Sequence, residues 1–432
     1  MEFFYQDEAL FVGTKTDPIS GPLTGSVAGS VAGSLASSQT PSIQLSEFVK
    51  KQQTPCYLYD FEQILRRVHF FKKSLFFIAS QNIHFAVKAN HNEKILNLLS
   101  REGLGADTVS LGEIKRAIAS GFSAKNIIFS GVGKTTQDLQ QAIDLNIKQI
   151  NIESYSELLR IIKICGQKKQ SIDIGIRLNP RVSPDTHKAI ATGGADNKFG
   201  IDFSDLESVK KALKQNPEFV KLRGLSMHIG SNILKLAELE EAVLIIENYF
   251  NEFLKEGFEL TRLDLGGGLG IDYHNYQLGK DEALIQQYAD ILVNLHNRNP
   301  KIELMLEPGR ILVARSAILI TQVQYIKKNG STIFAVVDTG MNHLLRPALY
   351  DAHHQVWPLR LRNEVKKCYS VVGPICESTD VLAANVQLAI SEDDYLAIAD
   401  CGAYGMSMAS HYNLHELPRE YFFKDGQISN LA

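Results

Sequence analysis

The stretch Ile83-His84-Phe85-Ala86-Val87-Lys88-Ala89-Asn90 decides the fold, because an apolar strand-like run ends there in a lysine and a polar residue. Segments with helical periodicity, such as 154–166 and 236–257, separate this run from others like it. Strands that alternate with helices predict a parallel sheet, and eight repeats predict an α/β fold with a closed (β/α)8 TIM-type barrel. The seven other runs are residues 104–110, 126–131, 149–154, 172–179, 222–230, 260–268 and 303–310.

Lys88 stands where the first of these strands opens into the C-terminal face of the barrel, which is the face that carries catalysis in this fold. Desolvation lowers the pKa of a lysine, and a Schiff-base lysine needs a lowered pKa. The alternative is a lysine that reaches from a strand end back to solvent. An inward-facing barrel position disfavours that alternative, so we expect Lys88 to be catalytic and to have a lowered pKa.

The composition limits the partners and the compartment. The 432 residues are enough for a barrel and a second domain, and the net charge of −3 predicts neither a nucleic-acid partner nor a membrane-binding surface. No apolar run approaches the roughly 18–20 residues that span a bilayer, and the start Met-Glu-Phe-Phe does not resemble a secretory signal. Five scattered cysteines without metal-ligand spacing predict a reduced, cytoplasmic protein that holds no metal.

The pattern of apolar residues changes after the eighth run. Residues 61–315 make up the predicted barrel, and Asp60 is a candidate cap for its first helix. Residues 316–432 show short alternating apolar runs and an Asp425-Gly426 hairpin turn. This pattern predicts an antiparallel β domain.

The first 60 residues are expected to belong with that β domain rather than with the barrel. Residues 3–12 and 54–60 each look like a short strand, and the barrel does not need either of them. Between them, at about 15–41, lies an insertion rich in glycine, serine and alanine. Because small residues bury little surface, this insertion predicts a flexible surface loop.

Three groups at the predicted strand ends point to a cofactor that has a phosphate and a pyridine ring. The Gly266-Gly267-Gly268 turn suits a phosphate, although a glycine turn can also be purely structural. Glu307 suits a protonated ring nitrogen, or it could simply pair with Arg310. His228 could stack on a cofactor face, although a lone strand-end histidine is more often structural. Together with Lys88, these groups predict pyridoxal 5'-phosphate.

At this point the chain resembles the barrel-type (fold type III) pyridoxal-phosphate-dependent decarboxylases, and within them the diaminopimelate decarboxylases. The resemblance covers about residues 54–420 and implies an alanine-racemase-like pair of domains, a barrel followed by a C-terminal antiparallel β domain. It rests on the motifs Phe85-Ala86-Val87-Lys88-Ala89-Asn90, Gly105-Ala106-Asp107, Ser110-Leu111-Gly112-Glu113, Asn197-Lys198-Phe199-Gly200, His228-Ile229-Gly230-Ser231, Gly266-Gly267-Gly268, Glu307-Pro308-Gly309-Arg310, Arg346-Pro347-Ala348-Leu349-Tyr350, Cys376-Glu377-Ser378 and Gly402-Ala403-Tyr404-Gly405.

The resemblance implies a role for each matched position around the cofactor. Lys88 would hold the cofactor covalently. His228 and Glu307 would contact its ring. The residues around its phosphate would be Gly230, Ser231, Gly267, Gly268, Gly309, Arg310 and Tyr404.

The resemblance also implies a homodimer whose active sites lie between the subunits. Cys376, Glu377 and Tyr404 would reach across the interface. Cys376, or a group that it positions, would return a proton to Cα of the substrate. Alternatively, Cys376 is an inert small residue, as many cysteines are.

The matched residues near the substrate imply which amino acid is decarboxylated. Arg310 and Arg346 suit a carboxylate that remains after the reaction, and Glu377 suits the ammonium beside it. Together with Tyr350 and Tyr404 they imply that meso-2,6-diaminopimelate is converted to L-lysine and CO2, in the last step of lysine biosynthesis. A surface ion pair is the alternative for Arg346, because arginine is so often exposed.

Three other functions stay open at this stage. The first is a decarboxylase for another carboxylated diamino acid, such as carboxynorspermidine. The second is a racemase on the same barrel, which would need a second base on the opposite face of the cofactor. The third is a relative that binds the cofactor without catalysis.

Overall fold

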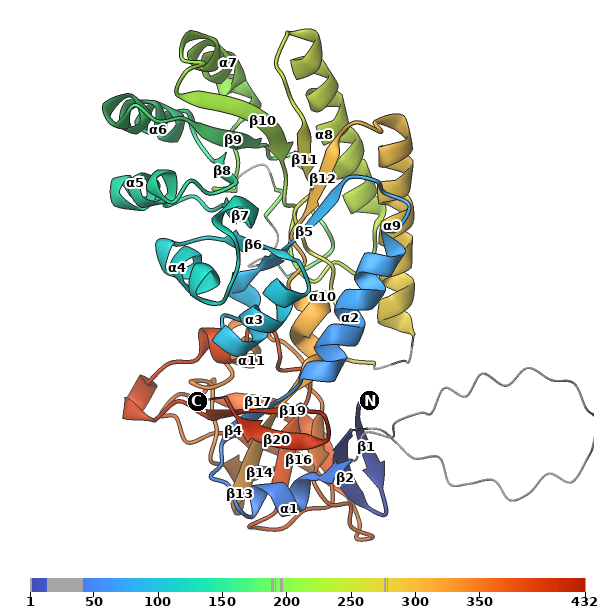
Figure 1. Cartoon of the computed structure of the whole chain (residues 1–432). Helices are drawn as coiled ribbons and strands as arrows, with labels where there is room; N and C mark the ends of the chain where they lie inside the picture. The colour runs from blue at the N-terminus through green and yellow to red at the C-terminus, as the bar shows by residue number, and fades with distance from the viewer. Residues whose placement is uncertain are drawn as a thin grey trace, which may run out of the picture.

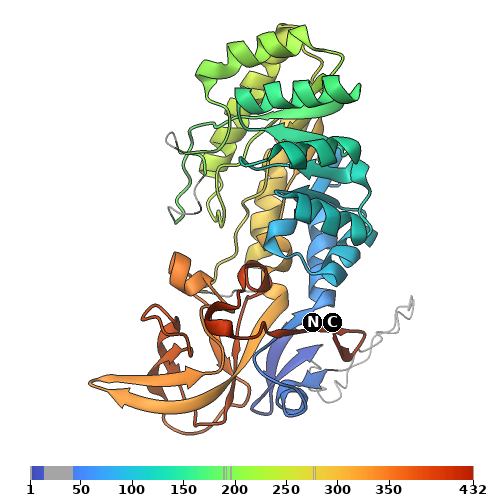
Figure 2. The same cartoon turned by 90° about the vertical axis from the view of Figure 1, so that its left-hand side faces the viewer.

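The computed structural model describes residues 2–13 and 42–431, apart from 188, 189, 191, 195, 196, 276 and 278. The insertion predicted at about 15–41 lies outside the described residues. The chain forms two parts, an α/β barrel in the upper half of Figure 1 and a β domain below it. The view in Figure 2 shows the same two parts from the side.

Eight parallel strands close into the barrel in the order β10-β11-β12-β5-β6-β7-β8-β9. The predicted (β/α)8 fold is therefore confirmed, and each strand falls on or beside one of the apolar runs. The strands are β5 (Gln81–Ala86), β6 (Gly105–Thr108), β7 (Ile127–Phe129), β8 (Gln149–Ile152), β9 (Ile172–Arg177), β10 (Val220–Ser226), β11 (Arg262–Asp264) and β12 (Glu303–Leu306).

Helices cover the outside of the barrel, and polar caps fix where they begin. The carboxylate of Asp60 accepts hydrogen bonds from the N–H groups of Glu62 and Gln63 at 2.9 and 3.0 Å, which satisfies two free donors of the first helix. Thr135 begins another helix with a reciprocal capping box. The helices are α2 (Phe61–Ser74), α3 (Glu93–Arg101), α4 (Leu111–Ala119), α5 (Thr136–Asp144), α6 (Tyr155–Lys168), α7 (Leu206–Gln215), α8 (Ala237–Lys255) and α9 (Lys280–Arg298).

The β domain is a mixed sheet to which both ends of the chain contribute. Strand β4 (Cys56–Asp60), which precedes the barrel, pairs antiparallel with β13 and parallel with β19. Strands β14 and β16 are also parallel, so the sheet is mostly but not wholly antiparallel. The remaining strands are β13 (Ala317–Asn329), β14 (Thr332–Val337), β15 (Val356–Pro358), β16 (Lys367–Val372), β17 (Val381–Leu388), β18 (Tyr395–Ile398), β19 (Arg419–Lys424) and β20 (Gln427–Asn430).

The prediction of one strand at 3–12 is wrong, because this segment is a hairpin. Asp7 and Glu8 adopt positive φ values of 46° and 64°, and the chain reverses there. The hairpin forms a separate small sheet with a third strand, and the N–H of Leu10 donates to the carbonyl of Leu359 at 2.9 Å in the β domain. These strands are β1 (Glu2–Gln6), β2 (Ala9–Gly13) and β3 (Ile43–Gln44).

Short elements lie where the two parts of the chain meet. Helix α10 (Arg310–Val313) follows the last barrel strand, and α11 (Arg346–Tyr350) projects from the β domain. A further short helix, α1 (Leu45–Val49), packs against the N-terminal hairpin. Among the described residues, no helix combines the length and apolarity needed to cross a membrane.

Candidate active site

The C-terminal strand ends of the barrel enclose a cavity of about 420 Å³, which we call the Lys88 cavity. Its lining comes from the ends of seven barrel strands and the loops that follow them. It therefore lies where a barrel enzyme places its chemistry. The lining residues include Lys88, Val109, Ser130, Asn151, Arg177, Phe199, Met227, His228 and Glu307.

Lys88 is paired with a buried carboxylate that was quoted in the sequence only as part of a motif. It lies in a 3-10 turn after β5, and its Nζ donates to Oδ2 of Asp107, at the end of β6, at 2.6 Å. Burial acts to lower the pKa of Lys88, but the negative charges of Asp107 and Glu307 outweigh it, and the pKa is raised. The expectation of a lowered pKa is therefore wrong for the protein without cofactor.

Three carboxyl groups gather at this place around a single lysine. Asp264 is fully buried and accepts hydrogen bonds from the N–H of Gly266 at 3.0 Å and from Nδ2 of Asn151 at 3.1 Å. Burial, followed by the charges of Asp107 and Asp264, raises the pKa of Glu307 well above its usual range. Burial also raises the pKa of Asp264 to about 6. Lys88 cannot balance all three groups, so the cluster lacks a cation.

Glu307 does not form the simple ion pair with Arg310 that the sequence left open. No such pair exists among the described residues; Glu307 instead shares a hydrogen bond with Asp264. Nη2 of Arg310 donates to Oγ of Ser231 at 2.9 Å. Nη1 donates to the hydroxyl of Tyr273 at 2.8 Å. The carboxyl group of Glu307 is thus left for a cation that the protein itself does not supply.

His228 lies in the Lys88 cavity as a neutral ring. Its Nδ1 accepts a hydrogen bond from the N–H of Gly267 at 3.3 Å, so the single ring proton belongs on Nε2. Burial, followed by the positive charges of Arg177 and Lys88, lowers the pKa of His228 to about 3. A neutral aromatic face is suited to stacking on a flat ring.

The glycine residues let three strand ends approach closely. Gly266 and Gly268 have φ values of +65° and +114°, which favour glycine. A side chain at Gly267 would overlap the carbonyl oxygen of Glu307, and one at Gly268 would meet the carbonyl oxygen of Gly230 at 2.6 Å. The turn after β11 therefore packs against the ends of β10 and β12, and it needs glycine at these positions.

Arg310 lies between this turn and the β domain. Its guanidinium carbon lies 4.8 Å from the centre of the Tyr404 ring. The N–H of Tyr404 donates to the carbonyl of Ala89, next to Lys88, at 2.8 Å. Tyr404 is thus part of the site of its own chain. That Tyr404 also reaches across a dimer interface stays a prediction.

Arg310 lines a second cavity of about 290 Å³, which we call the Arg346 cavity. Arg346 is 4% exposed, and its Nη1 donates to Nε2 of His354 at 2.7 Å. No carboxylate in the described chain lies within ion-pair distance of Arg346, so the alternative of a surface ion pair is excluded. Tyr350 also lines this cavity, with its ring 6.0 Å from that of His187.

Cys376 and Glu377 are not brought to Lys88 within one chain. Both are exposed, and neither lines either cavity. The N–H of Cys376 donates to Oδ1 of Asn413 at 3.3 Å, and a carboxylate oxygen of Glu377 accepts from the hydroxyl of Tyr412 at 2.5 Å. They form a separate exposed surface of the β domain.

Four residues of the site were not identified from the sequence. Asp107 and Arg177 stand at strand ends, as Lys88 does, so the barrel rule alone could have identified them. Tyr273 and His354 come from irregular loops, and no local sequence signal marks them. Their placement depends on how the barrel and the β domain meet.

The site fits pyridoxal 5'-phosphate, as judged from the groups that this chain supplies. Lys88 offers an amine, and the carboxyl cluster around Glu307 lacks a cation such as a protonated ring nitrogen. The buried guanidinium of Arg310, whose Nε has no partner among the described residues, offers N–H donors for a phosphate.

Comparison with known proteins gives a consistent result. The family model described as "Pyridoxal-dependent decarboxylase, pyridoxal binding domain" matches residues 61–314. The diaminopimelate decarboxylase of Aquifex aeolicus is 37% identical over 387 residues, which are 89% of this chain and 90% of the relative. That of Vibrio cholerae is 38% identical over 373 residues, which are 86% of this chain and 88% of the relative.

Solved structures agree in fold over most of the chain. The Helicobacter pylori diaminopimelate decarboxylase complexed with L-lysine superposes with a TM-score of 0.84 at 36% identity. It covers 90% of this chain and 96% of its own. The diaminopimelate decarboxylase of M. jannaschii in co-complex with L-lysine gives a TM-score of 0.83 at 33% identity and covers 91% of this chain and 93% of its own.

Proposed function

The chain belongs to the diaminopimelate decarboxylase family of pyridoxal-dependent decarboxylases, and from this premise we propose that it converts meso-2,6-diaminopimelate to L-lysine and CO2. This reaction is the last step of lysine biosynthesis. The observation that carries the choice of substrate is the pair of buried guanidiniums, Arg310 and Arg346, which have no carboxylate partner among the described residues. Such a pair is suited to a substrate that keeps a carboxylate after CO2 has left.

Pyridoxal phosphate, when bound, supplies an electron sink for the electron pair that the departing CO2 leaves behind. Lys88 would hold it covalently, and Glu307 would bind its ring nitrogen. His228 would cover one face of its ring. The residues that would surround the phosphate are Gly230, Ser231, Gly267, Gly268, Gly309, Arg310 and Tyr404.

The protein side chains prepare the site by fixing charge. Asp107 holds Nζ of Lys88 in place and keeps it protonated when no cofactor is bound. Burial and the neighbouring carboxyl groups raise the pKa of Glu307. A cation beside Glu307 would lower this pKa, so the carboxyl group would lose its proton more easily. Arg310 and Arg346 carry their charge throughout, so they can orient the substrate by the carboxylate that does not react.

We further propose a homodimer in which Cys376 and Glu377 of one subunit complete the site of the other. Glu377 would bind the distal ammonium of the substrate, and Cys376 would return a proton to Cα. Support comes from their exposed position and from the apolar side chain of Leu414, which is 93% exposed and follows Asn413, the residue that accepts the hydrogen bond from Cys376. An apolar side chain in that position gains from burial against a second subunit.

Shared sites predict complementation between two defective variants. Lys88→Ala and Cys376→Ala homodimers should each be severely impaired, whereas mixed dimers contain one site with both residues intact. Random pairing should therefore restore about a quarter of the wild-type turnover. If Cys376→Ala alone keeps normal kinetics, Cys376 has no part in the reaction. If mixing restores nothing, the site is not shared in this way.

We propose the cytoplasm as the compartment because all five cysteines, each within the described part of the chain, are free thiols. Three of them, Cys56, Cys165 and Cys401, are buried. A reducing compartment keeps such thiols in this state.

The decisive experiment measures CO2 and L-lysine released from purified, cofactor-loaded protein with meso-diaminopimelate. Ornithine, arginine, lysine and carboxynorspermidine are assayed in parallel, with Lys88→Ala as the inactive control. Release of L-lysine from diaminopimelate alone establishes the reaction and the substrate. Turnover of another compound keeps the cofactor chemistry and overturns the substrate. Racemisation without release of CO2 favours a racemase. Cofactor binding without any turnover favours a relative that binds the cofactor without catalysis.

A further inference from the structure

Arg346 is held by an unusual partner for a buried guanidinium. Its Nη1 donates to Nε2 of His354, which is 1% exposed. Its guanidinium carbon lies 4.3 Å from the centre of the Tyr273 ring. Both partners are uncharged, so Arg346 keeps its full positive charge in a place from which water is largely excluded.

A backbone carbonyl fixes His354 in the form that can accept this hydrogen bond. Nδ1 of His354 lies 2.7 Å from the carbonyl oxygen of Ala399, just after β18. A carbonyl only accepts, so the ring proton belongs on Nδ1 and Nε2 is left as the acceptor for Arg346. Burial, followed by the charge of Arg346, lowers the pKa of His354 to about 3, which keeps the ring neutral at physiological pH.

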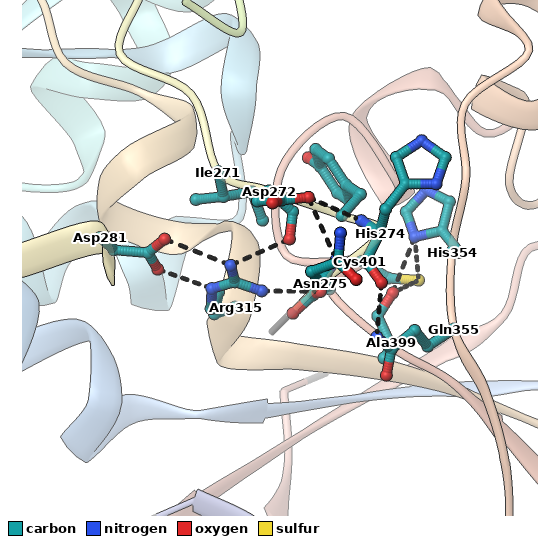
Figure 3. Close-up of polar contacts among 12 residues, drawn as sticks. Ile271, Asp272, His274, Asn275, Asp281, Arg315, His354, Gln355, Ala399 and Cys401 are labelled. Atoms are coloured by element: carbon teal, nitrogen blue, oxygen red, sulfur yellow. Dashed lines mark hydrogen bonds and ion pairs between the residues drawn. The ribbon is translucent and has the colours of Figure 1, made fainter. Parts of the chain in front are cut away.

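The loop that carries Tyr273 is fixed at its backbone on both sides. Nη2 of Arg315 donates to the carbonyl of Asp272 at 3.1 Å, and Nε2 of Gln355 donates to the carbonyl of His274 at 3.2 Å. Figure 3 shows Arg315 reaching both Asp281 and this loop, with His354, Ala399 and Cys401 grouped beside it. Arg346 is therefore positioned by a rigid frame rather than by a single contact.

We propose that His354 is a positioning residue that orients the guanidinium of Arg346 toward the retained carboxylate of the substrate without neutralising its charge. This inference rests on the proposed function, since it specifies how that substrate is recognised. A carboxylate at position 354 would hold Arg346 equally well, but it would also occupy the charge that the substrate needs. A neutral acceptor separates the two tasks of holding the side chain and leaving it free to bind an anion.

Two ligands distinguish this role from a general structural one. L-Lysine has the carboxylate that Arg346 is expected to bind, whereas 1,5-diaminopentane has the same chain and amines without a carboxylate. Dissociation constants for both are measured on the cofactor-loaded enzyme, together with kcat and KM for meso-diaminopimelate. The variants are His354→Leu, His354→Gln and His354→Glu. His69→Gln is the control, because His69 is an exposed histidine on α2 with a side chain 60% accessible.

We expect His354→Leu to weaken L-lysine binding by about tenfold or more, the size of one lost hydrogen bond to a charged group, and to change 1,5-diaminopentane binding by less than about threefold. KM should rise more than kcat falls. His354→Gln should recover most of the loss, because its amide oxygen can accept near the position of Nε2. His354→Glu should weaken L-lysine binding more than His354→Leu does.

Equal weakening of both ligands in His354→Leu, or no weakening of L-lysine, would overturn the positioning role. L-Lysine binding in His354→Glu that matches the wild type would do the same, since it would show that the charge need not stay free. The proposed function is judged separately. If the wild-type enzyme neither decarboxylates diaminopimelate nor binds L-lysine, it is the substrate assignment that fails.

Discussion

At the scale of single residues, the site is defined by a shortage of positive charge. Asp107, Asp264 and Glu307 are buried together, and Lys88 pairs directly with Asp107 alone. A buried acid without a cation keeps its proton, which is why the pKa of Glu307 is raised. The protein without cofactor therefore carries an electrostatic strain that a cationic ring nitrogen would relieve.

This strain predicts that Glu307→Gln stabilises the cofactor-free protein. A carboxyl group whose folded pKa is raised binds its proton more tightly in the folded state, so its contribution to stability is lost as pH rises from the unfolded pKa through the folded one. Glutamine removes this loss. We expect the free energy of unfolding at pH 8 to rise by roughly 1–2 kcal/mol, measured by urea denaturation of the cofactor-free protein. Cofactor should then stabilise the variant less than it stabilises the wild type.

Glu303→Gln is the matched control, because the expected sign is opposite. Burial acts to raise the pKa of Glu303, but Lys148 and Arg262 outweigh it and the pKa is lowered. Such a group adds stability above its unfolded pKa, and that stability is lost as pH falls. Glu303→Gln should therefore destabilise the protein at pH 8. If both variants shift stability in the same direction, the account of the cluster is wrong.

The same cluster predicts the reactivity of Lys88. Asp107→Asn removes the largest of the influences that raise the pKa of Lys88, so this pKa should fall toward the lowered value that burial alone favours. Acylation of Lys88 in the cofactor-free protein, followed by peptide mass spectrometry, should then become faster at pH 8. Each unit of pKa corresponds to about tenfold more free amine. The exposed Lys51 is an internal reference, and equal Lys88 labelling in both proteins would contradict the prediction.

Sequence reasoning at this scale located the strand-end residues but not their partners. Lys88, His228 and Glu307 lie together in one cavity, as the barrel pattern predicts. The raised pKa of Lys88 was missed because it depends on Asp107, whose distance from Lys88 is a tertiary property. His354 follows no repeating pattern, and only the packed structure shows that it meets Arg346.

At the scale of elements, the turn after β11 is the part that depends most on glycine. Gly267 allows the turn to approach the carbonyl oxygen of Glu307, and a methyl group there would overlap it. We expect Gly267→Ala to weaken cofactor affinity by at least about tenfold and to destabilise the protein by about 1–3 kcal/mol, the usual cost of overpacking. Cofactor titration and thermal unfolding measure the two effects.

Gly133→Ala is the control for this prediction. Gly133 lies in another loop that borders the Lys88 cavity, and a Cβ at that position meets no atom within 4 Å. It should change stability by less than about 0.5 kcal/mol, as is usual for a substitution without new contacts. Equal effects of the two substitutions would show that the close approach at Gly267 has no special importance.

Elements are predictable from the sequence when their signals are local. The cap at Asp60 and the alternation of strands and helices lie within short windows, and the structure confirms the elements that they predict. The hairpin at 2–13 was missed because Glu8 is not a residue typical of a reversal with positive φ.

At the scale of the whole molecule, the active site depends on how the barrel meets the β domain. The (β/α)8 barrel follows from eight repeats of one pattern, so it could be predicted without any tertiary contact. The docking of Tyr404 and Arg346 onto it could not, because the contacts join residues far apart in the chain. The pairing of subunits is harder still to predict from the sequence, since a single chain carries only half of such an interface.

Arg315 is the residue that most directly joins the two parts of the molecule. Its guanidinium pairs with Asp281 of α9 at 2.6 Å and with Asp400 of the β domain at 3.0 Å. It is also the donor to the carbonyl of Asp272 in the loop that carries Tyr273. Because the side chain is only 6% exposed, these pairs are shielded from water and salt. Removal of Arg315 would leave Asp400 buried without its cation.

We therefore expect Arg315→Leu to destabilise the protein by about 3–5 kcal/mol, the range found when one partner of a buried ion pair is removed. Burial already raises the pKa of Asp400 to about 6, against the lowering effect of Arg315. Without Arg315 the folded pKa should rise further, so stability should continue to fall with pH over a wider range. The difference between wild type and variant should thus be larger at pH 8 than at pH 5.

The control is Arg116→Leu, which breaks an exposed pair with Glu93 and should cost less than about 1 kcal/mol at both pH values. Urea denaturation at the two pH values measures the free energy of unfolding of each variant. A loss in Arg315→Leu that does not depend on pH would reflect lost packing rather than the buried charge of Asp400. A loss no larger than that of Arg116→Leu would mean that contacts other than those of Arg315 join the barrel to the β domain.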